Sequence, residues 1–144
     1  EAKGIELEAR HALGDWTAAA GWSWVDSEVE GRGAASALDG LRPAQTPRHS
    51  LSSTLAWAKG GVRASLTARY VGAQFEDDLN RQRLPGAFTL DATASVPLGR
   101  RLAVEARAEN VTGARILAGL SGDGIAERAT PRTLWIGLRF GGLR

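Results

Sequence analysis

The most constraining feature of this sequence is a two-residue alternation of apolar and polar side chains, repeated in seven separate runs. In the clearest run, residues 62–70, Val, Ala, Leu, Ala and Tyr alternate with Arg, Ser, Thr and Arg. Successive side chains of a β-strand point to opposite faces, so this period predicts strands with two different faces and an all-β fold class. The expected strands cover residues 4–13, 16–24, 51–57, 62–70, 88–96, 102–109 and 134–140.

The connections between these runs alternate between short and long. Bacterial outer-membrane barrels have short periplasmic turns and longer extracellular loops, whereas a soluble sandwich has no reason to place every long loop at one end. We therefore predict an antiparallel up-and-down segment of a transmembrane β-barrel. Short turns are expected at 14–15, 59–61 and 97–100, and long loops at about 30–49, 76–86 and 112–132.

Charged residues of the runs fall on the face opposite the aliphatic side chains. An Arg or Lys on the lipid side at the bilayer centre costs roughly 2–4 kcal/mol, which favours such segregation. A soluble antiparallel sheet with one packed face has the same pattern, so charge alone does not decide. The charges on this face are Glu6, Glu8, Arg10, Arg63, Arg69, Asp91, Glu105, Arg107, Glu109 and Arg139.

Aromatic residues near the ends of the runs favour the membrane. Barrels carry aromatic girdles at both edges of an apolar band about 25 Å tall. Trp16 and Trp24 share one face, and at the usual strand rise and tilt they are separated by roughly 20 Å along the membrane normal. The predicted girdle residues are Trp16, Trp24, Trp57, Tyr70, Phe88 and Phe140.

Composition excludes several function classes. The chain contains no Cys, and its net charge is only +2 with scattered basic residues, which excludes a thiolate metal site and disfavours nucleic-acid binding. No run of apolar residues is long enough for a transmembrane helix. His11 and His49 lie on different elements, and no triad or carboxylate pair stands out, so we predict no metal, no cofactor and no enzyme activity.

One acidic cluster is a candidate for ligand binding. Glu76, Asp77 and Asp78 are consecutive on a predicted extracellular loop, where carboxylates are able to bind a cation or a basic ligand group. A solvated loop is the interpretation that we favour over ligand binding for this cluster. The absence of Met and of a signal peptide suggests that the chain is a piece of a longer protein.

An ordered set of motifs resembles the C-terminal barrel region of TonB-dependent outer-membrane receptors. The resemblance covers nearly the whole chain. The matching stretches are GIELEAR (4–10), RPAQTPRHS (42–50), ARYVGAQFEDDLN (68–80), LPGAFTLDATASV (84–96), AEN (108–110) and PRTLWIGLRF (131–140).

This resemblance implies a larger receptor in the outer membrane. Residues 1–144 would supply about seven final strands of a 22-stranded barrel, whose plug domain and earlier strands are absent. The receptor would import a scarce nutrient, such as an iron–siderophore complex or cobalamin, with energy from TonB. Its partners would be outer-membrane lipid, the remaining barrel and plug, TonB and the barrel-assembly machinery. The last run resembles an assembly signal formed by Leu134, Ile136, Leu138 and Phe140.

Two other interpretations stay open on the sequence. The first is a small complete outer-membrane barrel with an adhesive or structural role, which needs an even strand number and hence an eighth strand, for example from a hairpin within 114–128. The second is a soluble β-sandwich that acts as a binding module.

Overall fold

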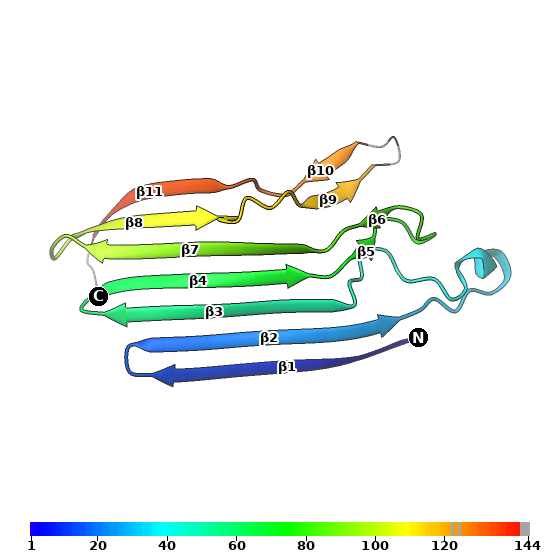
Figure 1. Cartoon of the computed structure of the whole chain (residues 1–144), viewed down its shortest axis with the longest axis horizontal. Coiled ribbons are helices and arrows are strands. Elements are labelled where there is room, and N and C mark those ends of the chain that lie inside the picture. The colour runs from blue at the N-terminus through cyan, green and yellow to red at the C-terminus, as the bar shows by residue number, and fades with distance from the viewer. Residues whose placement is uncertain (122, 124, 142–144) are drawn as a thin grey trace.

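The computed structural model of the chain describes residues 1–121, 123 and 125–141. Its main element is a single antiparallel sheet of seven strands in the order β1-β2-β3-β4-β7-β8-β11 (Figure 1). Each main strand pairs with the strand that follows it in this order, so the topology is up-and-down, as predicted. The strands are β1 (Ala2–Leu13), β2 (Trp16–Ser27), β3 (His49–Lys59), β4 (Val62–Val71), β7 (Ala87–Pro97), β8 (Leu102–Glu109) and β11 (Thr133–Phe140).

The alternation of short and long connections is confirmed. The three short turns lie at one end of the sheet and the three long connections at the other (Figure 1). Gly60 and Gly61 both have positive φ, at 57° and 84°, the backbone that a tight two-residue hairpin needs. Several strands extend two or three residues further toward the loops than predicted, and β3 begins at His49 rather than Leu51.

The long connections contain structure that the alternation did not predict. A 3-10 helix, η1 (Gly33–Leu38), lies in the first, and the strands β5 (Gln74–Phe75) and β6 (Arg83–Leu84) pair in the second. In the third, β9 (Leu117–Leu120) pairs with β10 (Ala126–Arg128). The hairpin considered within 114–128 therefore forms, but it stands outside the main sheet. The main sheet keeps seven strands, an odd number that does not suit a small closed barrel.

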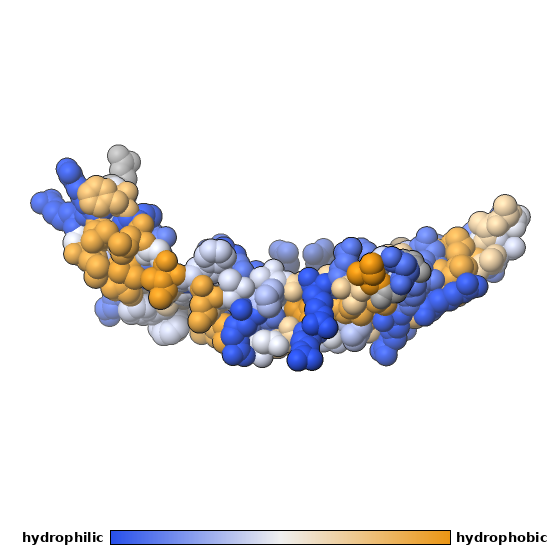
Figure 2. All heavy atoms as spheres, turned by 90° about the horizontal axis from the view of Figure 1, so that it is seen from above, coloured by the Kyte–Doolittle hydropathy of each residue, from blue (hydrophilic) through white to orange (hydrophobic). Residues whose placement is uncertain are grey.

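The sheet is a single curved layer (Figure 2). Only Leu84 and Ala103 are buried apolar residues in the described part of the chain, and large side chains stay open along the strands. Leu55 is 45% exposed and Leu138 is 72% exposed. Soluble domains bury an apolar sheet face against a second layer, and no second layer covers this sheet among the described residues. The described residues therefore do not form a sandwich, and the curvature of this single layer fits a segment of a barrel wall.

Candidate functional site

The strand register places all the predicted lipid-facing residues on one face. Leu55 on β3 pairs with Leu66 on β4, which pairs in turn with Ala92 on β7. Ala92 pairs with Ala108 on β8, and Ala108 pairs with Leu134 on β11. An apolar row therefore crosses five neighbouring strands without an interruption by charge. This continuous surface is called the apolar face below.

Aromatic residues occupy both ends of the apolar face. At the turn end, Trp16 pairs with Trp57, and their ring centroids are 6.4 Å apart. At the loop end, Tyr70 pairs directly with Phe88, while Trp24 lies on β2. Phe140 is the last residue of β11, also at the turn end. The six aromatics proposed as girdle residues thus divide into two groups of three.

Sequence patterns missed a further ring beside the loop-end aromatics. His49 was expected in a loop, yet it begins β3 and pairs with Trp24. Its ring stacks on Trp22 at 5.9 Å with an interplanar angle of 22°. The signal was available, since His49 continues the alternation of Leu51, but the preceding Pro-rich stretch concealed the strand start.

Ion pairs bound the apolar face at both ends. At the loop end, Asp26 is the next residue after Trp24 on the same face. Its Oδ1 lies 3.1 Å from Arg48 Nη2, and its Oδ2 lies 3.7 Å from Lys3 Nζ. At the turn end, Asp15 precedes Trp16, and its Oδ2 lies 3.1 Å from Lys59 Nζ. Asp26 follows Asp15 by eleven residues. At the usual strand rise and tilt of a barrel, this separation corresponds to roughly 28 Å along the membrane normal.

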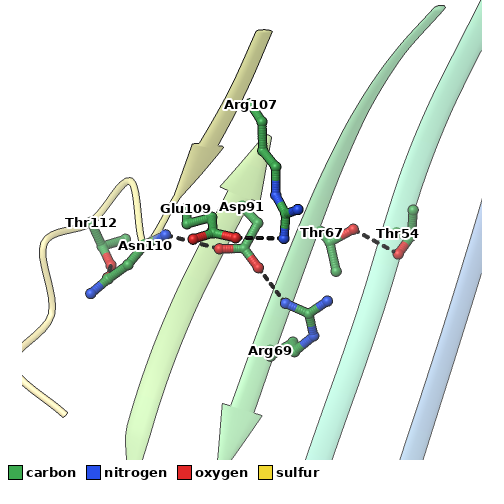
Figure 3. A network of polar contacts seen from close by, with 8 residues as sticks. All are labelled: Thr54, Thr67, Arg69, Asp91, Arg107, Glu109, Asn110 and Thr112. Atoms are coloured by element: carbon green, nitrogen blue, oxygen red, sulfur yellow. Dashed lines mark hydrogen bonds and ion pairs between the residues drawn. The ribbon is translucent and has the colours of Figure 1, made fainter. Parts of the chain in front are cut away.

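The opposite face carries the charges and hydroxyls and is called the polar face. Arg69 on β4 forms an ion pair with Asp91 on β7, and the Nε of Arg139 donates to Glu105 at 2.6 Å. Hydroxyls also pair between strands, such as Thr54 with Thr67 at 3.0 Å (Figure 3). These contacts hold the charged side chains in fixed cross-strand pairs.

Asn110 fastens the third long connection to this face. The residue is 3% exposed, and it has a positive φ of 48° directly after β8. The Nδ2 donates to the carbonyls of Ala114 at 2.8 Å and Thr130 at 3.2 Å, while Oδ1 accepts from the Ala114 amide at 3.0 Å. The backbone amide of Asn110 donates to Oδ1 of Asp91 at 2.8 Å. This bond links the third long connection to the contacts of the polar face (Figure 3).

The acidic cluster lies on the loop between β5 and β6. Asp77 Oδ1 accepts from the amides of Arg81 at 2.9 Å and Gln82 at 2.7 Å. These bonds, that of Gln82 first, lower the pKa of the Asp77 carboxyl. Asp78 Oδ1 accepts from the Ala44 amide at 3.0 Å. These carboxylates thus bond to backbone amides, while their predicted contact with a ligand stays a prediction.

The last strand presents four large side chains on the apolar face. Leu134, Ile136, Leu138 and Phe140 are 72–84% exposed, because β11 is an edge strand of the sheet. Their alternation matches the pattern predicted for the assembly signal. Its function as a signal stays a prediction.

Among the described residues, no helix is both long and apolar enough to span a bilayer. Nor do three or more His, Asp or Glu side chains converge there into a possible metal site.

Comparison with known proteins agrees with this geometry. Residues 1–111 match the family model described as TonB dependent receptor-like, beta-barrel. The ferric yersiniabactin uptake receptor FyuA from Yersinia pestis superposes with a TM-score of 0.85 at 22% identity, over 96% of this chain and 23% of that receptor. The siderophore receptor PiuA from Acinetobacter baumannii gives a TM-score of 0.83 at 18% identity, over 96% and 21%.

A third solved structure, the ferric citrate transporter FecA, gives a TM-score of 0.82 at 19% identity, over 96% of this chain and 24% of that one. No curated protein matches the chain. The chain therefore spans between a fifth and a quarter of the length of these receptors. Family match and shared fold agree, and the chain belongs to the TonB-dependent receptor family, of whose β-barrel it forms seven antiparallel strands.

Proposed function

We propose that this chain is part of an outer-membrane receptor that imports a scarce nutrient, with an iron–siderophore complex as the leading substrate class. The observation that carries the proposal is an uncovered apolar face on a barrel segment of this family. The three solved structures described above are named as receptors or transporters of siderophores or ferric complexes. Cobalamin is the alternative nutrient.

In this proposal the apolar face contacts lipid. The ion pairs at Asp26 and Asp15 bracket a band of roughly 28 Å, close to the apolar height of about 25 Å in outer-membrane barrels. Trp16, Trp57 and Phe140 then form the periplasmic girdle, and Trp24, Tyr70 and Phe88 form the extracellular one. The three long connections face the outside of the cell.

The other proposed partners are the rest of the receptor, TonB and the barrel-assembly machinery. The open edges at β1 and β11 pair with the remaining strands, since an unpaired strand edge in lipid leaves backbone groups without hydrogen bonds. The polar face then lines the lumen and faces the plug. TonB supplies energy through the N-terminal region, and the barrel-assembly machinery inserts the protein. The proposed role is transport rather than catalysis.

The test uses a strain that lacks the whole receptor gene. We expect uptake of radioactive iron, supplied as siderophore complexes under iron limitation, to fall for at least one complex and to return with the intact gene. The full receptor should also fractionate with the outer membrane. Unchanged iron uptake with lost cobalamin uptake would move the proposal to the alternative substrate, and a receptor found outside the outer membrane would reject it.

A further inference from the structure

The segment of the first long connection next to β3 is bound to the second long connection by side chains far away in sequence. Asn80 Oδ1 accepts from the Arg42 amide at 3.0 Å, and Asn80 Nδ2 donates to the Arg42 carbonyl at 2.8 Å. One side chain therefore satisfies both backbone groups of a residue 38 positions away. An Asn amide in this position replaces the pair of bonds that a neighbouring strand would make.

Further bonds extend this contact on both sides of Arg42. The Gln45 amide donates to the Phe75 carbonyl at 2.7 Å, next to the bond from Ala44 to Asp78. Gln45 Nε2 also donates to Glu76 at 3.3 Å. The Arg42 guanidinium lies 5.7 Å from the centre of the Phe75 ring, within the range of a cation–π contact. Residues 42–45 thus dock along the edge of β5 and the loop after it.

Each connection is also closed within itself. In the first, Val29 and Leu41 are joined by a backbone bond of 2.8 Å, and the Gly31 amide donates to Asp39 at 3.0 Å. In the second, Asp77 accepts from the amides after it, and β5 pairs with β6. Because both segments are internally bonded, the bonds between them join two ordered bodies rather than two loose loops.

We propose that connections 28–48 and 72–86 form one rigid unit and that the hydrogen bonds of the Asn80 side chain hold them together. A ligand that arrives from outside then meets a preformed wall on this side of the barrel, and any movement of one connection carries the other with it. The statement about the ligand rests on the proposed function, whereas the coupling of the two connections does not. Glu76 and Asp78 also take part in the contact between the two connections, which gives the acidic cluster a structural role.

The decisive variant is Asn80→Gly in the full-length receptor, purified in detergent. Asn80 has a φ of 54°, a conformation that glycine adopts without strain, so this change removes the side-chain bonds and spares the backbone. Hydrogen–deuterium exchange is measured on peptides that cover 42–46 and 76–82. We expect exchange in both segments to accelerate by on the order of tenfold, the loss of one to two net hydrogen bonds.

The matched control is Asn110→Gly, because Asn110 has a similar φ of 48° but fastens a different connection. It should accelerate exchange at 110–116 and leave 42–46 unchanged. Asp78→Ala, which removes the bond to the Ala44 amide, should accelerate 42–46 as well. The proposal is wrong if 42–46 exchanges without protection in the unmodified receptor, or if Asn80→Gly accelerates only 76–82. Neither outcome depends on whether the receptor transports iron.

Discussion

Arg69 on β4 forms a diagonal ion pair with Asp91 on β7, whose direct register partner is Thr67, and the second carboxylate oxygen of Asp91 accepts the backbone amide of Asn110 at 2.8 Å. Asp91 therefore joins the barrel wall to the start of the third long connection (Figure 3). The Arg69 side chain is 53% exposed, so the ion pair alone contributes little. The bond to the amide is the stronger contribution, because Asn110 is buried and its N–H has no other acceptor among the described contacts.

This difference predicts how two substitutions rank. Asp91→Ala should lower the free energy of unfolding by about 1–3 kcal/mol, because it leaves a buried amide without an acceptor. Arg69→Met should lower it by less than about 1 kcal/mol, since only the exposed ion pair is lost. Urea unfolding of the full receptor in detergent, followed by tryptophan fluorescence, gives both values. Equal losses would show that the amide bond contributes nothing beyond the ion pair.

Asn110 itself should control the protease sensitivity of the third connection. Asn110→Ala removes its bonds to Ala114 and Thr130 and forces a positive φ on alanine. Trypsin cleavage after Arg115 and Arg128 should accelerate by about tenfold or more, the factor that corresponds to a loss of 1.4 kcal/mol or more. Mass spectrometry of timed digests identifies the sites. Asn80→Ala is the control, and equal acceleration at Arg115 in that variant would contradict a local role for Asn110.

The loop after β5 should depend on pH through Asp77. The amides of Gln82 and Arg81 lower the pKa of the folded Asp77 carboxyl below its unfolded value. The stabilisation is therefore complete above an unfolded pKa of about 3.9 and is lost as the pH falls through the lower folded pKa. Hydrogen exchange at Arg81 and Gln82, corrected for intrinsic rates, should accelerate in this acidic range. Asp77→Asn removes the titrating carboxyl. If this variant keeps the same pH dependence of exchange, a group other than Asp77 causes it.

The membrane assignment of the two faces is tested by neighbouring residues. Leu66 lies in the middle of the apolar face and is 43% exposed, whereas Thr67 points to the polar face. Leu66→Arg should destabilise the barrel by roughly 2–4 kcal/mol, as for Arg at the bilayer centre, and Thr67→Arg should be tolerated. The folded fraction in the outer membrane, measured as heat-modifiable barrel on gels, checks this. Equal folding of the two variants would exclude lipid contact at Leu66.

The main sheet was predictable because its signal is local. Alternation within each run sets the face of every residue, and the turn lengths set which strands are neighbours. The contacts of the long connections are different in kind. Asn80 bonds Arg42, and Asp78 bonds Ala44, across more than thirty residues, and no periodic pattern encodes such pairs. The sequence therefore suggested either a solvated loop or carboxylates free to bind a ligand, whereas two of these carboxylates accept bonds from backbone amides.

The ends of the apolar face were also not predictable from the alternation. Lys3 and Asp26 lie on the face parity of Ile5 and Trp24, but the predicted strands stopped before them. The alternation becomes charged there, so a rule based on apolar periodicity ends the strand at the last apolar residue. Only the ladder bonds of the structure carry the strand past the aromatic residues to the ion pair with Arg48.

The proposed role of the last strand makes Phe140 the final test. Phe140 and Phe88 are both exposed aromatics of the apolar face, at 80% and 47%, but only Phe140 ends the last strand. If both are ordinary lipid-facing residues, Phe88→Ala and Phe140→Ala should lower the stability of the receptor by similar amounts. If Phe140 is part of an assembly signal, Phe140→Ala should additionally slow insertion. Pulse-labelled receptor is followed to its heat-modifiable form in the outer membrane, and urea midpoints are measured on the folded product. A slower appearance for Phe140→Ala at matched midpoints supports the signal, whereas equal rates for the two variants leave Phe140 as a girdle residue alone.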